Sequence, residues 1–400
     1  MRLALSDDQS AFGRECRRLF EKEWSTALVR EVATPTGPGH HDHLHRRIAE
    51  AGWLEIAAAA PGDDEFGTLI ELGIAYQEAG RALAPTTLYS CVFAELLLRR
   101  CSNPIVAAEL NHQIASGNAL ATVAYLEPDA PAADLAGNYR TVASRDGECW
   151  ILNGQKAFVL NAASADKLLV TARVVDPASP SGTSFGVFLV DAQARGVERT
   201  EYHTFGHDSQ SEVTFENVAL HGDSLLAGPL ETDAWREFFG TIVDEVTALL
   251  CMEMVGGAER VLDDTAAYVA QREAFGRPIG TFQAVQHMLA NLAVEVAAAR
   301  VASRYAVWAV SAKHDARREV SVAKSWISRV YKDATMTAHQ LFGGAGYVRE
   351  ADLHLWSQRA KAAEPLFGGR VHHLRRLASL GGTVSQWTGF GPEGQRRDHA

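Results

Sequence analysis

Two segments in the C-terminal half carry side chains suited to binding a diphosphate. The first, 272–288, places Arg272 just beyond a long apolar stretch, followed by a Gly/Pro break and Gln283. The second has Gln340 at the end of another apolar stretch, with three glycines in the four positions 343–346. Arginine forks and glycine-rich backbone both offer several N–H donors at close range. Each segment alone is also typical of a helix cap or a turn, so the inference depends on the pair.

The composition limits the classes of function. Four hundred residues, 47% apolar and 22% charged, predict two or three globular domains. The net charge of −11 argues against nucleic acid as the main partner, because phosphate binding needs a basic surface. No window approaches the roughly 18 unbroken apolar residues of a membrane span, and no signal-peptide core is present. The five cysteines lie far apart, which fits reduced thiols and a cytoplasmic location better than disulfides or zinc.

Apolar periodicity divides the chain into helical, β and helical parts. Three- and four-residue steps between apolar residues predict an N-terminal helical domain over 1–119. Short runs rich in β-branched and aromatic residues, bounded by turn formers, predict a middle β domain over 120–228, as a compact barrel or sandwich. Long apolar stripes over 229–382 predict a C-terminal four-helix bundle. Residues 383–400 form a polar tail.

This order and several local motifs resemble the acyl-CoA dehydrogenase family over nearly the whole chain. The motifs include Ala51-Gly52-Trp53-Leu54, the run from Glu78 to Pro85 and the Leu-x-Gly-x-Lys turn that ends at Lys156. The resemblance implies an α+β, mainly α fold: an N-terminal helical domain, a middle β-barrel domain and a C-terminal four-helix bundle. It also implies a tetramer, FAD as cofactor, an acyl-CoA or carrier-bound acyl thioester as substrate, and an electron-transfer flavoprotein as acceptor.

The same resemblance assigns the two C-terminal segments to the cofactor. In the family, these positions reach across a dimer interface to the FAD that is held mainly by the neighbouring subunit. The matching residues are Arg272, Phe275, Gln283, Gln340, Gly343 and Gly344.

The chain departs from the family pattern where the flavin ring would lie. The family motif Thr-Glu-Pro-x-x-Gly-Ser begins here with Leu126, and the Gly-Ser pair is absent. Leu160 stands where a family threonine contacts the flavin N5. Two leucines in place of hydroxyls remove hydrogen-bond donors that the flavin edge would use. A repacked pocket that still holds flavin is the alternative interpretation.

The position of the catalytic base also departs from the family. Desaturation next to a thioester needs a base to remove the α-proton. Anchored on Arg359, the usual position near the C-terminus falls on Gly368, which cannot accept a proton. Glu364 lies a full turn earlier and is expected to face elsewhere.

A second family position for the base lies on the helix before Arg272 and falls on Val246. The adjacent Glu245 is therefore the candidate base, and Glu253 is a weaker one. A one-residue shift rotates a helical side chain by about 100°. A solvated helical carboxylate without a catalytic role is at least as good an interpretation of Glu245.

The leading hypothesis is an acyl-CoA dehydrogenase-type flavoprotein that introduces an α,β double bond. The chain keeps the groups that a subunit lends to its neighbour and departs where it would hold its own flavin. This pattern resembles the partner subunit of heteromeric, steroid-type members. A flavin-dependent monooxygenase on the same fold and a non-catalytic structural subunit are the alternatives. The histidine-rich run 370–376 predicts no metal site, because adjacent histidines point to different helix faces.

Overall fold

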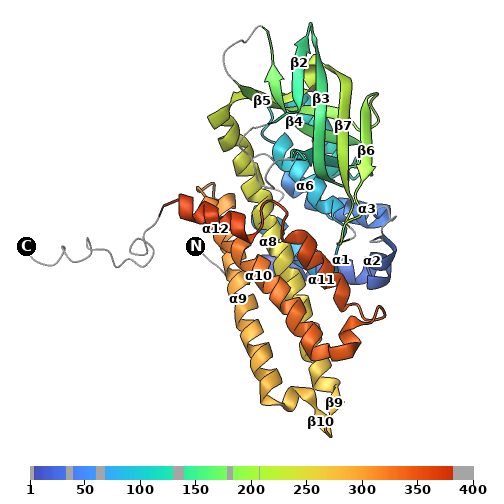
Figure 1. Cartoon of the computed structure of the whole chain (residues 1–400), viewed down its shortest axis with the longest axis vertical. Coiled ribbons are helices and arrows are strands. Elements are labelled where there is room, and N and C mark those ends of the chain that lie inside the picture. The colour runs from blue at the N-terminus through green and yellow to red at the C-terminus, as the bar shows by residue number, and fades with distance from the viewer. Residues whose placement is uncertain are drawn as a thin grey trace, which may run out of the picture.

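The computed structural model describes residues 4–32, 39–59, 68–128, 139–177, 183–206 and 208–381. Helices precede and follow one block of strands (Figure 1). The chain is thus mainly helical with a sheet domain in the middle, as the sequence predicts. None of the helices in these ranges is long and apolar enough to cross a membrane.

Local sequence signals start several of the N-terminal helices. Ser6 and Gln9 form a capping box at the first helix, and Thr68 and Glu71 form another. Asn103 caps a third helix, which has proline at its first position. These helices are α1 (Asp7–Glu23), α2 (Thr26–Val32), α3 (Asp42–Glu50), α4 (Trp53–Ala58), α5 (Leu69–Ala82), α6 (Thr87–Leu98) and α7 (Pro104–Ala115).

Eight strands form one sheet in the order β6-β7-β3-β2-β4-β5-β8, with β1 beside β4. The pairs β1–β4 and β2–β4 are parallel, and the other pairs are antiparallel. Inside the sheet domain, the buried Lys156 ammonium lies 2.9 Å from Glu127. The strands are β1 (Ala121–Ala124), β2 (Val142–Asp146), β3 (Cys149–Leu160), β4 (Lys167–Val175), β5 (Ser184–Asp191), β6 (Val197–Glu201), β7 (Gln210–His221) and β8 (Leu225–Glu231).

The C-terminal part is a helical bundle built around α8, a helix of 40 residues. Helices α8, α9 and α10 pack against one another, and α11 and α12 pack against α10. A short hairpin, β9–β10, joins α8 to α9 at the end of the bundle away from the sheet (Figure 1). The elements are α8 (Thr232–Gln271), β9 (Glu273–Ala274), β10 (Arg277–Pro278), α9 (Gln283–Ser311), α10 (Arg317–Phe342), α11 (Leu353–Ala363) and α12 (Arg370–Ser379).

The N-terminal helices and the bundle share one hydrophobic core, because α5 and α8 cross at backbone distance. A β-carbon at Gly80 would lie 1.9 Å from the carbonyl oxygen of Glu253. A β-carbon at Gly256 would lie 1.8 Å from the carbonyl oxygen of Gln77. Only glycine fits at either position, so these two residues fix how closely the helices approach.

Candidate functional site

The structure brings the two predicted cofactor-binding segments together at the hairpin end of the bundle. The ring of Tyr268, in the last turn of α8, stacks on that of Phe342 at 4.0 Å between centroids and 9° between planes. The Tyr268 hydroxyl donates to the Phe342 carbonyl at 3.4 Å. This contact joins the end of α8, which leads into Arg272, to the end of α10, which leads into the glycine-rich turn.

The predicted cofactor-binding side chains at this end are exposed. Phe275 is 94% exposed at the tip of the hairpin, with φ +54, next to Gly276 with φ +78. Arg272 ends α8, Gln283 begins α9, and Gln340 lies in the last turn of α10; all three are exposed. Their side chains make no hydrogen bond or ion pair within the described residues. These donors are therefore available to a group from outside the chain.

Gly343 and Gly344 lie on the same open surface. Gly343 ends α10 with φ +58, where glycine is favoured. Gly344 has no such backbone requirement, and a β-carbon there would meet nothing within 4 Å. The fold of this chain does not need glycine at Gly344, whereas the close approach of a ligand or a second chain would.

A second candidate site is a cavity of about 1080 Å³ beside the first half of α8. Its wall includes the end of α6, the start of α10, part of α12 and the loop before α12. A cavity of this size falls at the upper end of the usual range for small-molecule sites. The described part of the chain contains no group of three or more metal-ligating side chains, here or elsewhere.

Glu245, the predicted base, lies in the wall of this cavity but is held by two arginines. Its Oε1 accepts from Arg99 at 2.9 Å and from Arg100 at 2.6 Å. The Glu245 side chain is 4% exposed and that of Arg99 is 8% exposed. Both charge-assisted hydrogen bonds fix the carboxylate through Oε1, whereas Oε2 is buried and has no hydrogen-bond partner within the described residues.

The neighbouring carboxylates of the cavity are also engaged. Asp244 receives a two-pronged contact from Arg376 at 2.5 and 2.8 Å. Asp233 pairs with Arg236, and Asp315 pairs with Arg317. Glu237, for which the described residues offer no ion pair, is exposed on α8. The cavity therefore presents paired charges where an acyl pocket would be apolar.

The loop between α11 and α12 sends an aromatic ring into the cavity wall. Counting from Arg359, the sequence places Gly368 at the usual position of the base. In the structure, the side chain of the preceding residue, Phe367, lines the cavity. The Phe367 ring packs 5.6 Å from that of Phe93 and 6.4 Å from that of Tyr125. Phe367 has φ +55, a strained conformation for a bulky residue. Neither Phe367 nor Gly368 can accept a proton.

Buried polar groups hold this loop in place. The Lys324 ammonium donates to the carbonyls of Ala363 and Glu364 at 2.8 and 2.9 Å, at the end of α11. Burial lowers the pKa of Lys324 to about 8. His373 contacts the Phe367 carbonyl through Nε2 at 3.2 Å, and burial lowers its pKa to about 3. His373 is therefore neutral at pH 7 and donates to the loop from Nε2.

The other predicted carboxylates lie away from the cavity. Glu253 is fully buried on α8, 3.7 Å from the Arg359 guanidinium, and burial raises its pKa. Glu364 ends α11 and pairs with Lys361 at 2.8 Å on the partly exposed side of the helix. The structure thus separates these two residues from Glu245.

The two leucines of the sheet domain face the protein interior. Leu160 is buried, and its carbonyl accepts from the Thr122 hydroxyl at 2.6 Å. Leu126 is half-buried against the main core, and its carbonyl accepts from the Ala157 amide. Nearby on β3, Phe158 is half-exposed. The two leucine side chains supply no donor to a flavin, so this part of the chain fits the cofactor less well than the hairpin end does.

Two family descriptions match the sequence. "Acyl-CoA dehydrogenase, middle domain" matches residues 122–218, and "Acyl-CoA dehydrogenase, C-terminal domain" matches residues 243–379. Together they span more than half of the chain, over both the sheet and the bundle. The chain belongs to the acyl-CoA dehydrogenase family. This is a family of flavoproteins that oxidise CH–CH bonds, as the sequence resemblance implied.

Relatives match over most of their length. A long-chain specific mitochondrial acyl-CoA dehydrogenase of Sus scrofa is 26% identical over 94% of this chain and 87% of the relative. The solved Tcur3481–Tcur3483 steroid acyl-CoA dehydrogenase is 29% identical over 94% of this chain and 97% of that chain, with a TM-score of 0.79. The ChsE4–ChsE5 complex of Mycobacterium tuberculosis is 27% identical over 95% and 98%, with a TM-score of 0.77.

Sequence reasoning missed Phe367 and the arginine pair at Glu245. Phe367 was missed because a loop between two helices has no period that fixes which side chain points inward. Arg99 and Arg100 follow three leucines at the end of α6. Two adjacent arginines after a fully apolar run were a signal that a buried carboxylate would be needed nearby.

Proposed function

We propose that this chain is the non-catalytic subunit of a heteromeric acyl-CoA dehydrogenase. It lends Arg272, Phe275, Gln283, Gln340 and the Gly343–Gly344 turn to an FAD that is held mainly by a second chain. That second chain supplies the base for α,β-desaturation of an acyl-CoA. The bound flavin supplies the acceptor for the β-hydride.

The proposal depends most on one observation: the buried carboxylates in the cavity wall of this chain are paired with arginines. Glu245 and Asp244 are buried against arginines, and the loop position of the usual base carries Phe367 and Gly368. No described carboxylate combines a place in the cavity wall with freedom from an ion pair, except the exposed Glu237. The desaturation reaction needs such a group next to the substrate.

The length of α8 supports a role for the hairpin toward another chain. The 40 residues of α8 correspond to about 60 Å of helix between the sheet domain and Arg272. The hairpin therefore lies at the end of the bundle away from the sheet domain of the same chain (Figure 1). Exposed guanidinium, amide and backbone N–H groups at the hairpin can hold a diphosphate by charge-assisted hydrogen bonds.

The similarity to two solved assemblies whose names join two proteins supports a heteromer. The five cysteines, all free thiols, support a reducing cytoplasmic setting. An electron-transfer flavoprotein is the proposed electron acceptor, by family resemblance.

The visible absorption spectrum of the chain purified alone tests the proposal. We expect a colourless protein that retains little FAD, and a yellow complex when the chain is purified from its native host with its partner. In that complex, Arg272→Gln should lower the retained FAD, whereas Glu245→Gln should leave desaturation in place. Full FAD occupancy of the isolated chain, with acyl-CoA desaturation that Glu245→Gln abolishes, would overturn the proposal.

A further inference from the structure

A separate cavity of about 310 Å³ lies between the N-terminal helices and the bundle, on the side of α8 that carries Met252. Its wall combines the start of α1, one face of α5, Met252, and one face of α9. No residue is shared with the cavity at Glu245 or with the hairpin surface. The lining residues are Ala4, Leu5, Ser6, Gln9, Ile70, Gly73, Ile74, Met252, Arg304, Val307 and Trp308.

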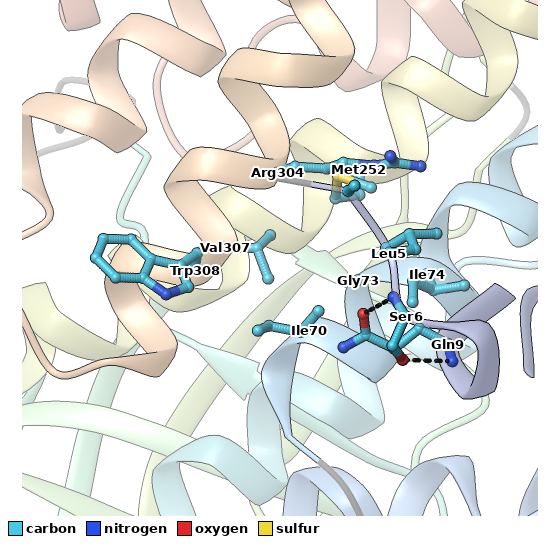
Figure 2. A pocket seen from close by; sticks show the side chains of 11 residues that line it. Leu5, Ser6, Gln9, Ile70, Gly73, Ile74, Met252, Arg304, Val307 and Trp308 are labelled. Atoms are coloured by element: carbon cyan, nitrogen blue, oxygen red, sulfur yellow. Dashed lines mark hydrogen bonds between the residues drawn. The ribbon is translucent and has the colours of Figure 1, made fainter. Parts of the chain in front are cut away.

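The cavity is apolar along most of its length and cationic at one side. Figure 2 shows Ile70, Val307 and Trp308 around one part of the space, and Arg304 and Met252 overlap in another part of the view. A side chain at Gly73 would occupy space in the cavity next to its wall, because a β-carbon there would lie 3.3 Å from Val307 and 3.5 Å from Met252.

Arg304 is the charged residue of this wall, and its side chain makes no hydrogen bond or ion pair within the described residues. Its Nε is buried and has no hydrogen-bond partner, and burial lowers the pKa of Arg304. The charge of Glu259 acts on Arg304, but the Glu259 carboxylate makes its hydrogen bonds elsewhere: it accepts from Arg300 at 3.1 Å and from Gln77 at 2.7 Å. Arg304 as a whole is half-buried, but a buried Nε–H without an acceptor is costly, and a ligand carboxylate would supply that acceptor.

Ser6 and Gln9, two other polar residues of the wall, already have hydrogen-bond partners. Ser6 and Gln9 form the reciprocal capping box of α1, drawn as dashed lines in Figure 2. The Gln9 side-chain amide also donates to Glu71 at 2.8 Å. Arg304 is therefore the group on this wall that an incoming anion would meet.

We propose that this cavity binds an amphiphilic monocarboxylate, an unbranched alkyl chain with one carboxylate head. The carboxylate pairs with the Arg304 guanidinium, and the alkyl chain lies among Ile70, Ile74, Met252, Val307 and Trp308. The volume lies at the lower end of the range for small-molecule sites, which favours a chain of medium length. The site is independent of FAD and of acyl-CoA chemistry.

Calorimetric titration of the full chain with decanoate, and with decanol as an uncharged probe, tests this proposal. We expect one decanoate per chain, and binding at least tenfold weaker in Arg304→Gln, because a charge-assisted hydrogen bond is lost. Decanol should bind the wild-type chain and Arg304→Gln equally. Ile70→Trp, which fills the cavity, should abolish binding of both probes while circular dichroism shows an unchanged fold.

Arg236→Gln is the matched control, because Arg236 lines the other cavity and pairs with Asp233 near the surface. Loss of decanoate binding in Arg236→Gln with full binding in Arg304→Gln would assign the carboxylate to the cavity at Glu245 and overturn the proposal. No binding of decanoate to the wild-type chain at millimolar concentration would overturn it as well. So would equal binding of decanoate by the wild-type chain and Arg304→Gln.

Discussion

In the described part of the chain, the polar side chains at the hairpin end of α8 are exposed and unpaired, whereas those in the first half of the same helix are buried and paired. At the hairpin end, Arg272 and the two nearby glutamines are exposed and make no side-chain hydrogen bond within the described residues. In the first half, Asp244 and Glu245 are buried against arginines. An exposed, unpaired donor is available to a ligand from outside, whereas a buried ion pair serves the stability of its own chain. The comparison therefore supports the proposed lending of groups by the hairpin and a structural role for Glu245.

Among the substitutions that distinguish the two regions, Glu245→Ala is expected to have the largest effect on the free energy of unfolding. Removal of this carboxylate leaves the buried Arg99 guanidinium and the partly exposed Arg100 guanidinium without their shared anion, so we expect the free energy of unfolding to fall by about 4 kcal/mol. Urea denaturation followed by fluorescence measures the change. Glu237→Ala, on the exposed side of the same helix, is the control, with an expected change within about 0.5 kcal/mol. A similar small change in both variants would mean that the Glu245 pair contributes nothing to the fold.

Substitutions of Phe367 test whether the aromatic ring is a packed part of the fold. Loss of the ring in Phe367→Ala should lower the free energy of unfolding by about 3 kcal/mol. Phe367→Gly loses the same ring but tolerates the positive φ, so it should be more stable than the alanine variant by about 1 kcal/mol. Thermal unfolding of the two variants gives the order. The reverse order would show that the loop relaxes to an ordinary backbone conformation.

The neutral state of His373 predicts a loss of stability in acid. Its pKa is about 3 in the folded chain and about 6.5 in an unfolded one. Below pH 6.5 the unfolded chain therefore binds a proton that the folded chain excludes, and stability falls by up to about 1.4 kcal/mol per pH unit.

His373→Gln should remove this slope. Between pH 6.5 and pH 4.5, the variant is expected to lose about 2 kcal/mol less stability than the wild-type chain, as measured by urea denaturation at each pH. His45, whose pKa burial lowers to about 4, titrates equally in both proteins and cancels. Parallel pH curves for the two proteins would show that His373 is accessible to protons in the folded state.

The smallest effects on stability are expected at the hairpin. Arg272→Gln and Phe275→Ser remove exposed side chains, so each should change the free energy of unfolding by no more than about 0.5 kcal/mol. In the heteromeric complex the same substitutions should lower FAD affinity tenfold or more, measured by flavin released on dilution. A large loss of stability with unchanged FAD affinity would mean that the hairpin side chains serve the fold of this chain and do not bind the cofactor.

The sequence was sufficient for the order of elements and less so for the cavity, and the cofactor role of the hairpin residues stays a prediction. The switch from three- and four-residue steps to short β-branched runs, and back, follows from burial of one face of each element. The hairpin residues were predicted from their match to the family motif, and the structure places Gly276 and Gly343, both with positive φ, beside them. Glu245 and Phe367 depend on helical phase and on loop conformation, which three-dimensional packing decides. Predicting a free base at Glu245 required knowing where Arg99 and Arg100 lie, and they are about 145 residues away in sequence.

Gly80 and Gly256 lie so close to carbonyl oxygens of the facing helix that they fix the position and the rotation of α8 relative to α5. Because α8 cannot slide or rotate at that crossing, the direction in which the hairpin points depends on the number of residues between the crossing and the end of the helix. One residue inserted between Gly257 and Gln271 would turn the hairpin by about 100° and advance it by about 1.5 Å. Arg272 and Phe275 would then face away from their present direction without any change in their own sequence. Among relatives of this chain, the number of residues from the glycine crossing to the arginine should therefore vary less than the sequence between them.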